Sequence, residues 1–168
     1  MIFITLGSQK FQFNRLLKAV DALIENQTIT EPVFAQIGAS DYEPVNYKYE
    51  RFMDREAFSK MEGQADIVIT HGGTGAIIGA VKQGKTVIAV PRLAIYGEHV
   101  DDHQLQLLKE FENMNIILVC RDVAELGEVY KRRNDVKLNS YDSNQMTIVE
   151  DIDGYLKDIK PRRHKRAK

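Results

Sequence analysis

Residues 65–75 read Ala-Asp-Ile-Val-Ile-Thr-His-Gly-Gly-Thr-Gly, an apolar run that stops at a glycine-rich loop. The β-branched residues in this run favour a buried strand over residues 65–70. The residues that follow the loop predict a helix from Ala76 to about Lys82. A strand, a glycine-rich loop and a helix in succession are typical of an α/β sheet.

The same alternation runs through the rest of the chain. Short apolar runs predict five further strands, at residues 2–6, 33–37, 47–52, 86–90 and 116–120. Helical spacing and capping residues predict helices near residues 13–26, 54–61, 101–111, 122–132 and 144–158. We therefore predict a Rossmann-like, doubly wound α/β domain with a mainly parallel six-stranded sheet. No internal repeat or low-complexity linker indicates a second domain.

Composition excludes several classes of protein. The chain has 168 residues and a mass of 19.2 kDa, with 43% hydrophobic and 28% charged residues, as in an ordinary globular domain. Its apolar runs are far shorter than the roughly 20 residues of a membrane-spanning helix, and no signal peptide is expected at residues 1–6. The single cysteine, Cys120, excludes an internal disulfide and a multi-cysteine metal site. These features predict a cytoplasmic protein.

Charge divides the chain into an acidic body and a basic tail. The chain has 23 basic and 24 acidic residues, but residues 161–168 carry five Lys or Arg and no acid. Residues 1–160 therefore have a net charge of −6, which argues against a nucleic-acid groove. We expect residues 1–160 to form the domain. Residues 161–168 are expected to be either a flexible solvated tail or a segment attracted to an anionic membrane surface.

Two loops are candidates for a ligand site. Gly7 and Ser8 follow the first predicted strand, and residues 71–75 follow the strand at 65–70. Ligands bind at the carboxyl ends of strands in open parallel sheets, and glycines let a ligand approach backbone N–H groups at a helix N-terminus. We expect this arrangement to bind a phosphate or diphosphate. The alternative is a tight turn between strand and helix that binds nothing.

A phosphate-loop pattern occurs at residues 79–86, but its context is reversed. Gly79-Ala-Val-Lys-Gln-Gly-Lys-Thr86 satisfies the pattern G-x-x-x-x-G-K-[ST]. A helix is predicted before it and a strand after it, whereas a phosphate loop needs a strand before it and a helix after it. We interpret Gly84 as the residue that ends the helix. The pattern G-x-G-x-x-G also fails, because Ile78 stands where its third glycine belongs.

Residues 98–104 read Glu-His-Val-Asp-Asp-His-Gln and combine two histidines with three carboxylates. Histidines four residues apart beside carboxylates could hold a metal ion. No second cluster of ligands supports that interpretation, so no metal is expected. Asp101 or Asp102 is instead predicted to cap a helix. His103 and Gln104 would then lie in its first turn and could contact the hydroxyl groups of a ligand.

These motifs, in this order, resemble a known enzyme family. Residues 65–75, then 84–91, then Asp102-His103-Gln104 are similar to the carboxyl-terminal, donor-binding half of family 28 glycosyltransferases. Residues 2–9 and 13–16 narrow the resemblance to stand-alone donor-binding subunits of bacterial capsule and exopolysaccharide glycosyltransferases. Those subunits are relatives of the catalytic subunit of the two-part eukaryotic enzyme that adds the second N-acetylglucosamine to a dolichol diphosphate-linked sugar.

The resemblance implies one half of a GT-B fold. It implies that this half binds a UDP-sugar, with galactose or N-acetylglucosamine as the sugar. A separate membrane-attached subunit would bind a lipid-diphosphate-linked saccharide as acceptor and recruit this chain to the inner face of the cell membrane. The implied reaction is inverting and needs neither a metal nor another cofactor, since helix N-termini would stabilise the leaving UDP.

The resemblance also assigns site residues. The backbone at Phe52 and Met53 would receive uracil, and His71 is the candidate for a direct catalytic role, with packing or diphosphate orientation as the alternatives. The diphosphate would lie among Gly7, Ser8, Gly72, Gly73, Thr74 and Gly75, and the remaining substrate contacts would come from Glu98, Asp102, His103 and Gln104. One position departs from the family, because Gly79 replaces the usual acidic, ribose-binding residue. The ribose contact and the catalytic base are therefore left open, and the base could lie on the partner.

Two other functions fit the same sequence. A binding-only module would share the fold and regulate a partner without donor chemistry. A phosphate-loop hydrolase would bind ATP or GTP with magnesium.

Overall fold

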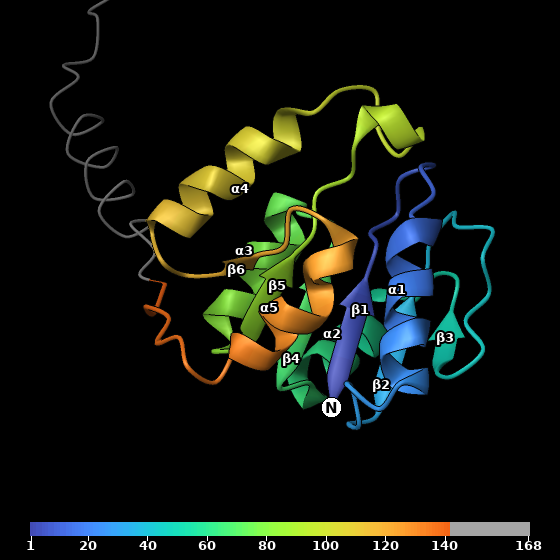
Figure 1. Ribbon diagram of the computed structural model, residues 1–168, viewed down its shortest axis with the longest axis horizontal. Coiled ribbons are helices and arrows are strands. Elements are labelled where there is room, and N and C mark those ends of the chain that lie inside the picture. The colour runs from blue at the N-terminus through green and yellow to red at the C-terminus, as the bar shows by residue number, and fades with distance from the viewer. Residues whose placement is uncertain (142–168) are drawn as a thin grey trace, which may run out of the picture.

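The computed structural model describes residues 1–141, and six strands in this part of the chain form one parallel sheet (Figure 1). The spatial order is β3-β2-β1-β4-β5-β6, and every neighbouring pair is parallel. The strands are β1 (Ile2–Thr5), β2 (Val33–Gln36), β3 (Lys48–Glu50), β4 (Ile67–Thr70), β5 (Thr86–Ala89) and β6 (Leu118–Val119). This order confirms the doubly wound, Rossmann-like sheet. The helix predicted at residues 144–158 and the tail at 161–168 lie outside the described residues.

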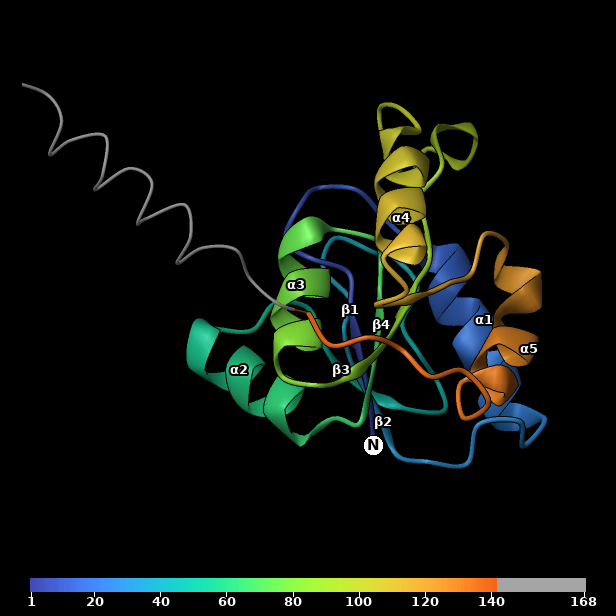
Figure 2. The ribbon, with the colours of Figure 1, turned by 90° about the vertical axis from the view of Figure 1, so that its left-hand side faces the viewer.

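Helices cover both faces of the sheet. They are α1 (Asn14–Glu25), α2 (Arg55–Gln64), α3 (Thr74–Lys82), α4 (His103–Asn113) and α5 (Leu126–Arg132), with short 3-10 turns η1 (Ala94–Tyr96) and η2 (Val123–Glu125). Figure 2 shows α1 and α5 on one side of the sheet and α2 and α3 on the other. None of the helices in residues 1–141 is long and apolar enough to span a membrane.

The central strand β1 builds the core by alternating its side chains. Ile2 and Ile4 pack with α1 and α5 on one face, whereas Phe3 packs with α3 and α4 on the other. All three side chains are fully buried, and burying each stabilises the fold by about 1.5–3 kcal/mol. A strand buried on both faces is apolar throughout, which is why the sequence shows a continuous run and not an alternating one.

Element boundaries differ from the sequence-based prediction by a few residues. Each strand is shorter than predicted, most clearly β6, where only Leu118–Val119 pair with β5 although residues 116–120 are all buried. The apolar sequence pattern indicates which residues are buried, but it does not show which of them form hydrogen bonds to a neighbouring strand. The predicted strand was therefore too long. The helix predicted at residues 122–132 begins instead with η2, because the carboxylate of Asp122 accepts a hydrogen bond from the Ala124 N–H and closes a tight turn. Asp54 caps α2 as predicted, accepting from the Ala57 N–H at 2.8 Å.

A buried carboxylate on α1 holds the loop that leads into β3. Asp21 accepts hydrogen bonds from the hydroxyl of Tyr42 at 2.7 Å and from the backbone N–H groups of Val45 and Asn46 at 3.0 and 2.8 Å. These bonds give the loop's N–H groups partners inside the protein. Asp21 therefore links the position of β3, and of the residues that follow it, to α1.

We predict that Asp21→Ala lowers the free energy of unfolding by about 1–3 kcal/mol, because three donors lose their acceptor. Urea unfolding followed by circular dichroism would measure the change. Glu25→Ala, an exposed carboxylate on the same helix, is the matched control and should change stability by less than about 0.5 kcal/mol. Equal stabilities of the two variants would contradict this account of Asp21.

Candidate functional site

A cavity of about 570 Å³ opens at the carboxyl ends of β1 and β4. These strands are neighbours in register, with Thr5 beside Thr70, but the strand order reverses between them. The loop after β1 leads to a helix on one face, and the loop after β4 leads to α3 on the other. A crevice forms where such loops diverge, and this is the usual ligand position in open α/β sheets.

The structure brings six of the predicted site residues together around this cavity. They are Gly7, Ser8, Met53, His71, Gly73 and Gly75. The other predicted residues do not line it: Phe52, Gly72, Thr74, Glu98, Asp102, His103 and Gln104. Only two residues of the glycine-rich loop, Gly73 and Gly75, therefore line the cavity. Thr74 is exposed, and Gly72 is buried against Leu108.

The His71 imidazole fills the floor of the crevice, and it leaves no room for a side chain at Gly7 or Gly73. A Cβ atom on Gly7, which has φ +71°, would lie 2.8 Å from His71 Cε1. A Cβ atom on Gly73 would lie 2.6 Å from His71 Nε2, which is also too close. Gly75 differs, because a Cβ atom there would meet nothing within 4 Å. The first two glycines make room for the imidazole, and the third leaves open space in the cavity.

His71 is neutral in this environment. Burial, together with the positive charge of Arg92, lowers the pKa of its imidazole to about 4. Nδ1 lies 3.3 Å from the carbonyl oxygen of Thr5, which can only accept, so Nδ1 carries the proton and Nε2 holds the lone pair. A neutral ring in this tautomer adds no positive charge for a bound anion. It can support the loop or accept a hydrogen bond at Nε2.

Several cavity residues were not predicted from the sequence. They are Thr5, Gln9, Gln36, Asp54, Arg55, Phe58 and Ala76. Arg55, the first residue of α2, is the one basic side chain among the cavity's lining residues. Gln36 ends β2, and its Nε2 donates to the Gly7 carbonyl at 3.4 Å. The rule that ligands bind at carboxyl ends, applied to β2 and β3 as well as to the glycine-rich loops, would have indicated both residues.

Residues 98–102 belong to the segment that leads from β5 into α4, and His103 and Gln104 are the first two residues of that helix. Glu98 is 1% exposed, and its carboxylate accepts two hydrogen bonds from the Arg15 guanidinium, at 3.1 and 2.9 Å. Gln104 Oε1 accepts from the Arg92 backbone N–H at 3.0 Å. These polar groups bind the protein itself and fix the loop. A contact between any of them and a donor sugar stays a prediction.

Asp102 occupies the predicted cap position of α4, but Asp101 makes the side-chain hydrogen bond to the helix. Asp102 occupies the N-cap position but makes no side-chain hydrogen bond to the helix, since its carboxylate accepts from the Ala94 N–H at 2.8 Å. The carboxylate of Asp101 accepts instead from the His103 N–H at 3.2 Å. Asp101 therefore supplies the hydrogen bond expected of a cap, and Asp102 ties the helix to η1.

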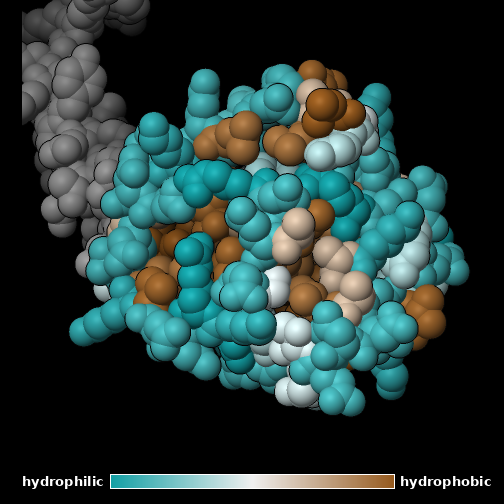
Figure 3. Space-filling model, viewed as in Figure 1, coloured by the Kyte–Doolittle hydropathy of each residue, from teal (hydrophilic) through white to brown (hydrophobic). Residues whose placement is uncertain are grey.

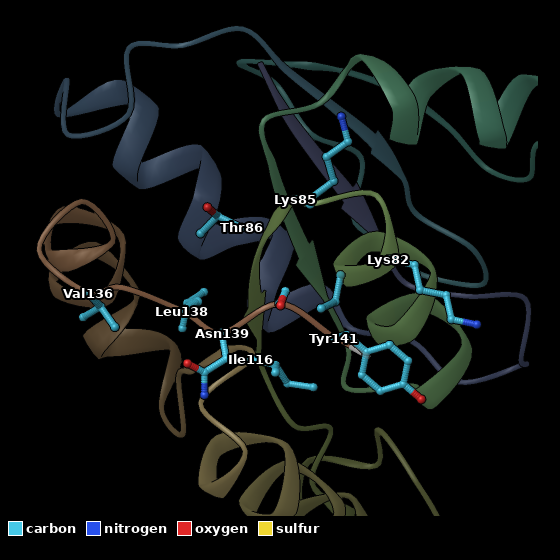
Figure 4. Close-up of a pocket in the computed structure, with 11 residues that line it drawn as sticks. Lys82, Lys85, Thr86, Ile116, Val136, Leu138, Asn139 and Tyr141 are labelled. Atoms are coloured by element: carbon cyan, nitrogen blue, oxygen red, sulfur yellow. The ribbon is translucent and has the colours of Figure 1, made fainter. Parts of the chain in front are cut away.

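The phosphate-loop pattern lies in the reversed context that the sequence predicted. Helix α3 precedes Gly84, whose φ of +69° ends the helix, and β5 begins at Thr86. Lys85 Nζ donates to the Gly63 carbonyl at 2.6 Å. Gly84, Lys85 and Thr86 line a second cavity, of about 450 Å³, at the amino end of β5 (Figure 4). That is the opposite edge of the sheet from the first cavity, so the pattern does not form a strand-to-helix phosphate loop.

The glycosyltransferase family 28 C-terminal domain profile matches residues 1–156. The chain belongs to this family. Two fungal relatives carry the description UDP-N-acetylglucosamine transferase subunit ALG13. The Candida glabrata protein is 35% identical over 68 residues, which are 40% of this chain and 32% of the relative. The Candida albicans protein is 28% identical over 117 residues, 70% of this chain and 36% of the relative. This family 28 chain thus spans about a third of the length of the curated relatives it matches.

Solved glycosyltransferases share the fold of this family 28 domain. SnogD from Streptomyces nogalater matches with a TM-score of 0.56 and 19% identity, over 80% of this chain and 34% of SnogD. MurG from Acinetobacter baumannii matches with a TM-score of 0.55 and 18% identity, over 79% of this chain and 42% of MurG. The domain is a single Rossmann-like, carboxyl-terminal half of a GT-B fold.

We predict that His71 stays neutral down to about pH 5, because its pKa in the folded state is about 4. An unfolded histidine has a pKa near 6.5, so the unfolded chain binds more protons between these values, and the free energy of unfolding falls by up to about 3 kcal/mol as pH drops from 6.5 to 4. NMR titration of the imidazole would measure the pKa directly, with His71→Asn to assign the resonance. An imidazole that titrates near pH 6.5 would contradict the burial described here.

Proposed function

We propose that this family 28 domain is the donor-binding, catalytic subunit of an inverting UDP-sugar glycosyltransferase. The observation that carries the proposal is the cavity between the loops after β1 and β4, where Gly7, Gly73 and Gly75 leave backbone groups open to a ligand. Its volume of about 570 Å³ lies within the usual range for small-molecule sites. The relatives described as UDP-N-acetylglucosamine transferase subunits support a UDP-sugar as the ligand.

The cavity has the polar groups that a diphosphate needs. Helix α3 begins at Thr74 with Gly73 as its N-cap, and no side chain caps its first turn. The free N–H groups and the helix dipole therefore offer partial positive charge at the cavity. Arg55, at the start of α2, adds a full positive charge to the lining of the cavity. We propose that these groups, with no metal ion required, stabilise the charge that develops on the leaving UDP.

The remaining parts of the donor are assigned by position. Met53 lines the cavity at the end of the β3 segment, so the proposed uracil contact is to the backbone at Phe52 and Met53. Position 79 offers the ribose no side chain. The carboxylate of Glu62 lies nearby, 3.4 Å from where a Cβ atom of residue 79 would be, but it is buried and accepts a hydrogen bond from Gln83. The proposed sugar contacts are His103 and Gln104, with Glu98 and Asp102 shaping their loop.

The acceptor side is proposed to come from a separate, membrane-attached subunit that binds a lipid-diphosphate-linked saccharide in capsule or exopolysaccharide synthesis. In support, both fungal relatives are described as a subunit of a UDP-N-acetylglucosamine transferase. Apolar side chains also gather along the edge of the molecule formed by η1 and α4 (Figure 3). Ile95, in η1, and Val100, just before α4, are 83% and 75% exposed. Such a cluster of exposed apolar residues is typical of a surface that meets another protein.

Calorimetric titration with UDP, UDP-galactose, UDP-N-acetylglucosamine and ATP, each with and without magnesium, tests the proposal. We expect saturable binding of UDP and of one UDP-sugar, independent of magnesium, and no binding of ATP. Magnesium-dependent ATP binding would revive the phosphate-loop hydrolase. The absence of any UDP binding would contradict the proposal and favour a binding-only module that regulates a partner.

We predict that Gly75→Val lowers UDP affinity at least tenfold, about 1.4 kcal/mol, because the new side chain enters open cavity space without disturbing its neighbours. Gly73→Val should have at least as large an effect, since it also displaces His71. Gly63→Ala, on α2 and away from the cavity, is the matched glycine control. Wild-type UDP affinity in folded Gly73→Val and Gly75→Val proteins would overturn the proposed diphosphate site.

We also predict that the purified chain binds the UDP-sugar but transfers it to a lipid-diphosphate acceptor at least a hundredfold more slowly than the complex with its partner. Holding donor and acceptor together supplies much of the rate in such a reaction. Transfer of radiolabelled sugar to extracted lipid would measure both rates. The complex formed with Gly75→Val serves as the inactive control. Near-complex rates from the isolated wild-type chain would disprove the requirement for a partner.

A further inference from the structure

Three side chains with metal-binding atoms converge at the start of α4. His99 Nδ1 lies 3.3 Å from Asp101 Oδ1, and His103 Nδ1 hydrogen-bonds the same oxygen. One ligand atom from each residue can be chosen so that all three lie within 4.8 Å of one another. Within residues 1–141 this is the one group of three or more His, Cys, Asp or Glu side chains arranged in this way. The sequence alone showed two histidines four residues apart, but not that the Asp101 carboxylate lies between them.

The backbone that carries the cluster is fixed at three points. Glu98, before it, binds Arg15 and accepts from the Leu93 N–H at 3.1 Å. Asp102 and Gln104 are held by the backbone N–H groups of Ala94 and Arg92. Glu98, Asp102 and Gln104, whose side chains bind elsewhere in the protein, thus hold the backbone on either side of the candidate ligands. A ligand set on a fixed backbone loses less conformational freedom when an ion binds.

The two imidazoles are also oriented before any ion binds. The His99 side chain is only 9% exposed and packs against the Phe11 ring, with the ring centroids 5.0 Å apart. The His103 ring stands at 68° to it, also with 5.0 Å between centroids. His103 is 57% exposed, so the cluster is open to solvent on one side. An ion can therefore reach a site whose inner wall is already packed.

We propose that His99, Asp101 and His103 bind a divalent transition-metal ion of the Zn²⁺ type. Two imidazole nitrogens and one carboxylate oxygen suit Zn²⁺, Co²⁺ or Ni²⁺, whereas Mg²⁺ and Ca²⁺ prefer oxygen ligands alone. An ion about 2.1 Å from each ligand atom would hold these atoms about 3.4 Å apart. His99 Nδ1 and Asp101 Oδ1, 3.3 Å apart, already have this spacing. Water from the exposed side would complete the coordination.

The ion would regulate the donor site. This consequence rests on the proposed function, in which His103 contacts the donor sugar. A metal ion bound to His103 removes that group as a hydrogen-bond partner and occupies space beside the sugar. It does not touch the glycine-lined cavity proposed for the diphosphate. Metal binding is therefore expected to weaken the affinity for the whole UDP-sugar more than the affinity for UDP.

Titration of the full chain with Co²⁺, followed by visible absorption, tests the site itself. We expect one bound Co²⁺ per chain, and at least tenfold weaker binding in His99→Ala, Asp101→Asn and His103→Ala. His103 is exposed, so its variant should fold normally, which circular dichroism would check. Glu110→Gln, an exposed residue of α4 outside the cluster, is the control and should bind Co²⁺ normally. Wild-type Co²⁺ affinity in all three cluster variants, or no saturable binding by the wild type, would overturn the proposal.

A second measurement separates the metal site from the proposed function. Protein loaded with one equivalent of Co²⁺ and freed of excess ion by gel filtration is titrated with UDP and with UDP-sugar. A fall in UDP-sugar affinity with unchanged UDP affinity supports the regulatory role, and its loss in His99→Ala confirms that the ion acts through this cluster. Equal affinities with and without Co²⁺, in a protein that binds Co²⁺ at one site, would refute the regulatory role while leaving the metal site in place. Failure to bind UDP at all would instead count against the proposed function.

Discussion

The pairing of β1 with β4 is the constraint on which the site depends. Four residue pairs, from Ile2 beside Ile67 to Thr5 beside Thr70, keep the two strands parallel and in register. Because their loops must then leave toward opposite faces, the sheet opens a crevice at its carboxyl edge whatever the loop sequences are. The sequence decides what fills that crevice. His71 forms its floor, which forbids a Cβ atom on both Gly7 and Gly73 and leaves backbone exposed on both sides of the ring.

Buried charge fixes the loops around the crevice and sets its electrostatics. Arg92 is fully buried, and its Nη2 donates hydrogen bonds to the carbonyl oxygens of Leu6 and Phe11. These bonds hold the loop after β5 against the loop after β1. Its Nε and Nη1 have no hydrogen-bond partner among the described residues, so its desolvation is only partly offset. Burial lowers the pKa of Arg92 to about 10, so its guanidinium still carries a full positive charge at neutral pH. That charge helps to keep His71 neutral. Positive potential at the cavity therefore comes from Arg55, the α3 N-terminus and the buried charge of Arg92, not from the histidine.

The sequence predicted what depends on local pattern and missed what depends on distant packing. All six strands and the loops after β1 and β4 were predicted correctly, because buried strands and glycine turns have local signatures. Arg55 and Phe58 were missed, since their position depends on how α2 packs, including the edge-to-face contact of Phe58 with Phe3 at 5.3 Å. The burial of Glu98 under Arg15, 83 residues away, has no local signal either. The sequence places His99, Asp101 and His103 on one segment, but it does not show how their side chains are oriented. It therefore could not show that the Asp101 carboxylate contacts both imidazoles.

The proposed division of labour between two subunits has a physical rationale in the arrangement of the site. The walls of the donor cavity come from the segments after β1, β3 and β4, all within one sheet, so a single domain can preorganise the groups proposed to hold UDP. Transfer makes a further demand, because the acceptor must approach the sugar from outside that sheet and water must be excluded while it does so. The side of the site next to Ile95 and Val100 carries exposed apolar residues, which a partner surface would bury. Burial of that surface would desolvate the site only when donor and acceptor are both present. On this argument the proposed dependence on a partner would protect the proposed UDP-sugar from unproductive hydrolysis as well as supplying proximity.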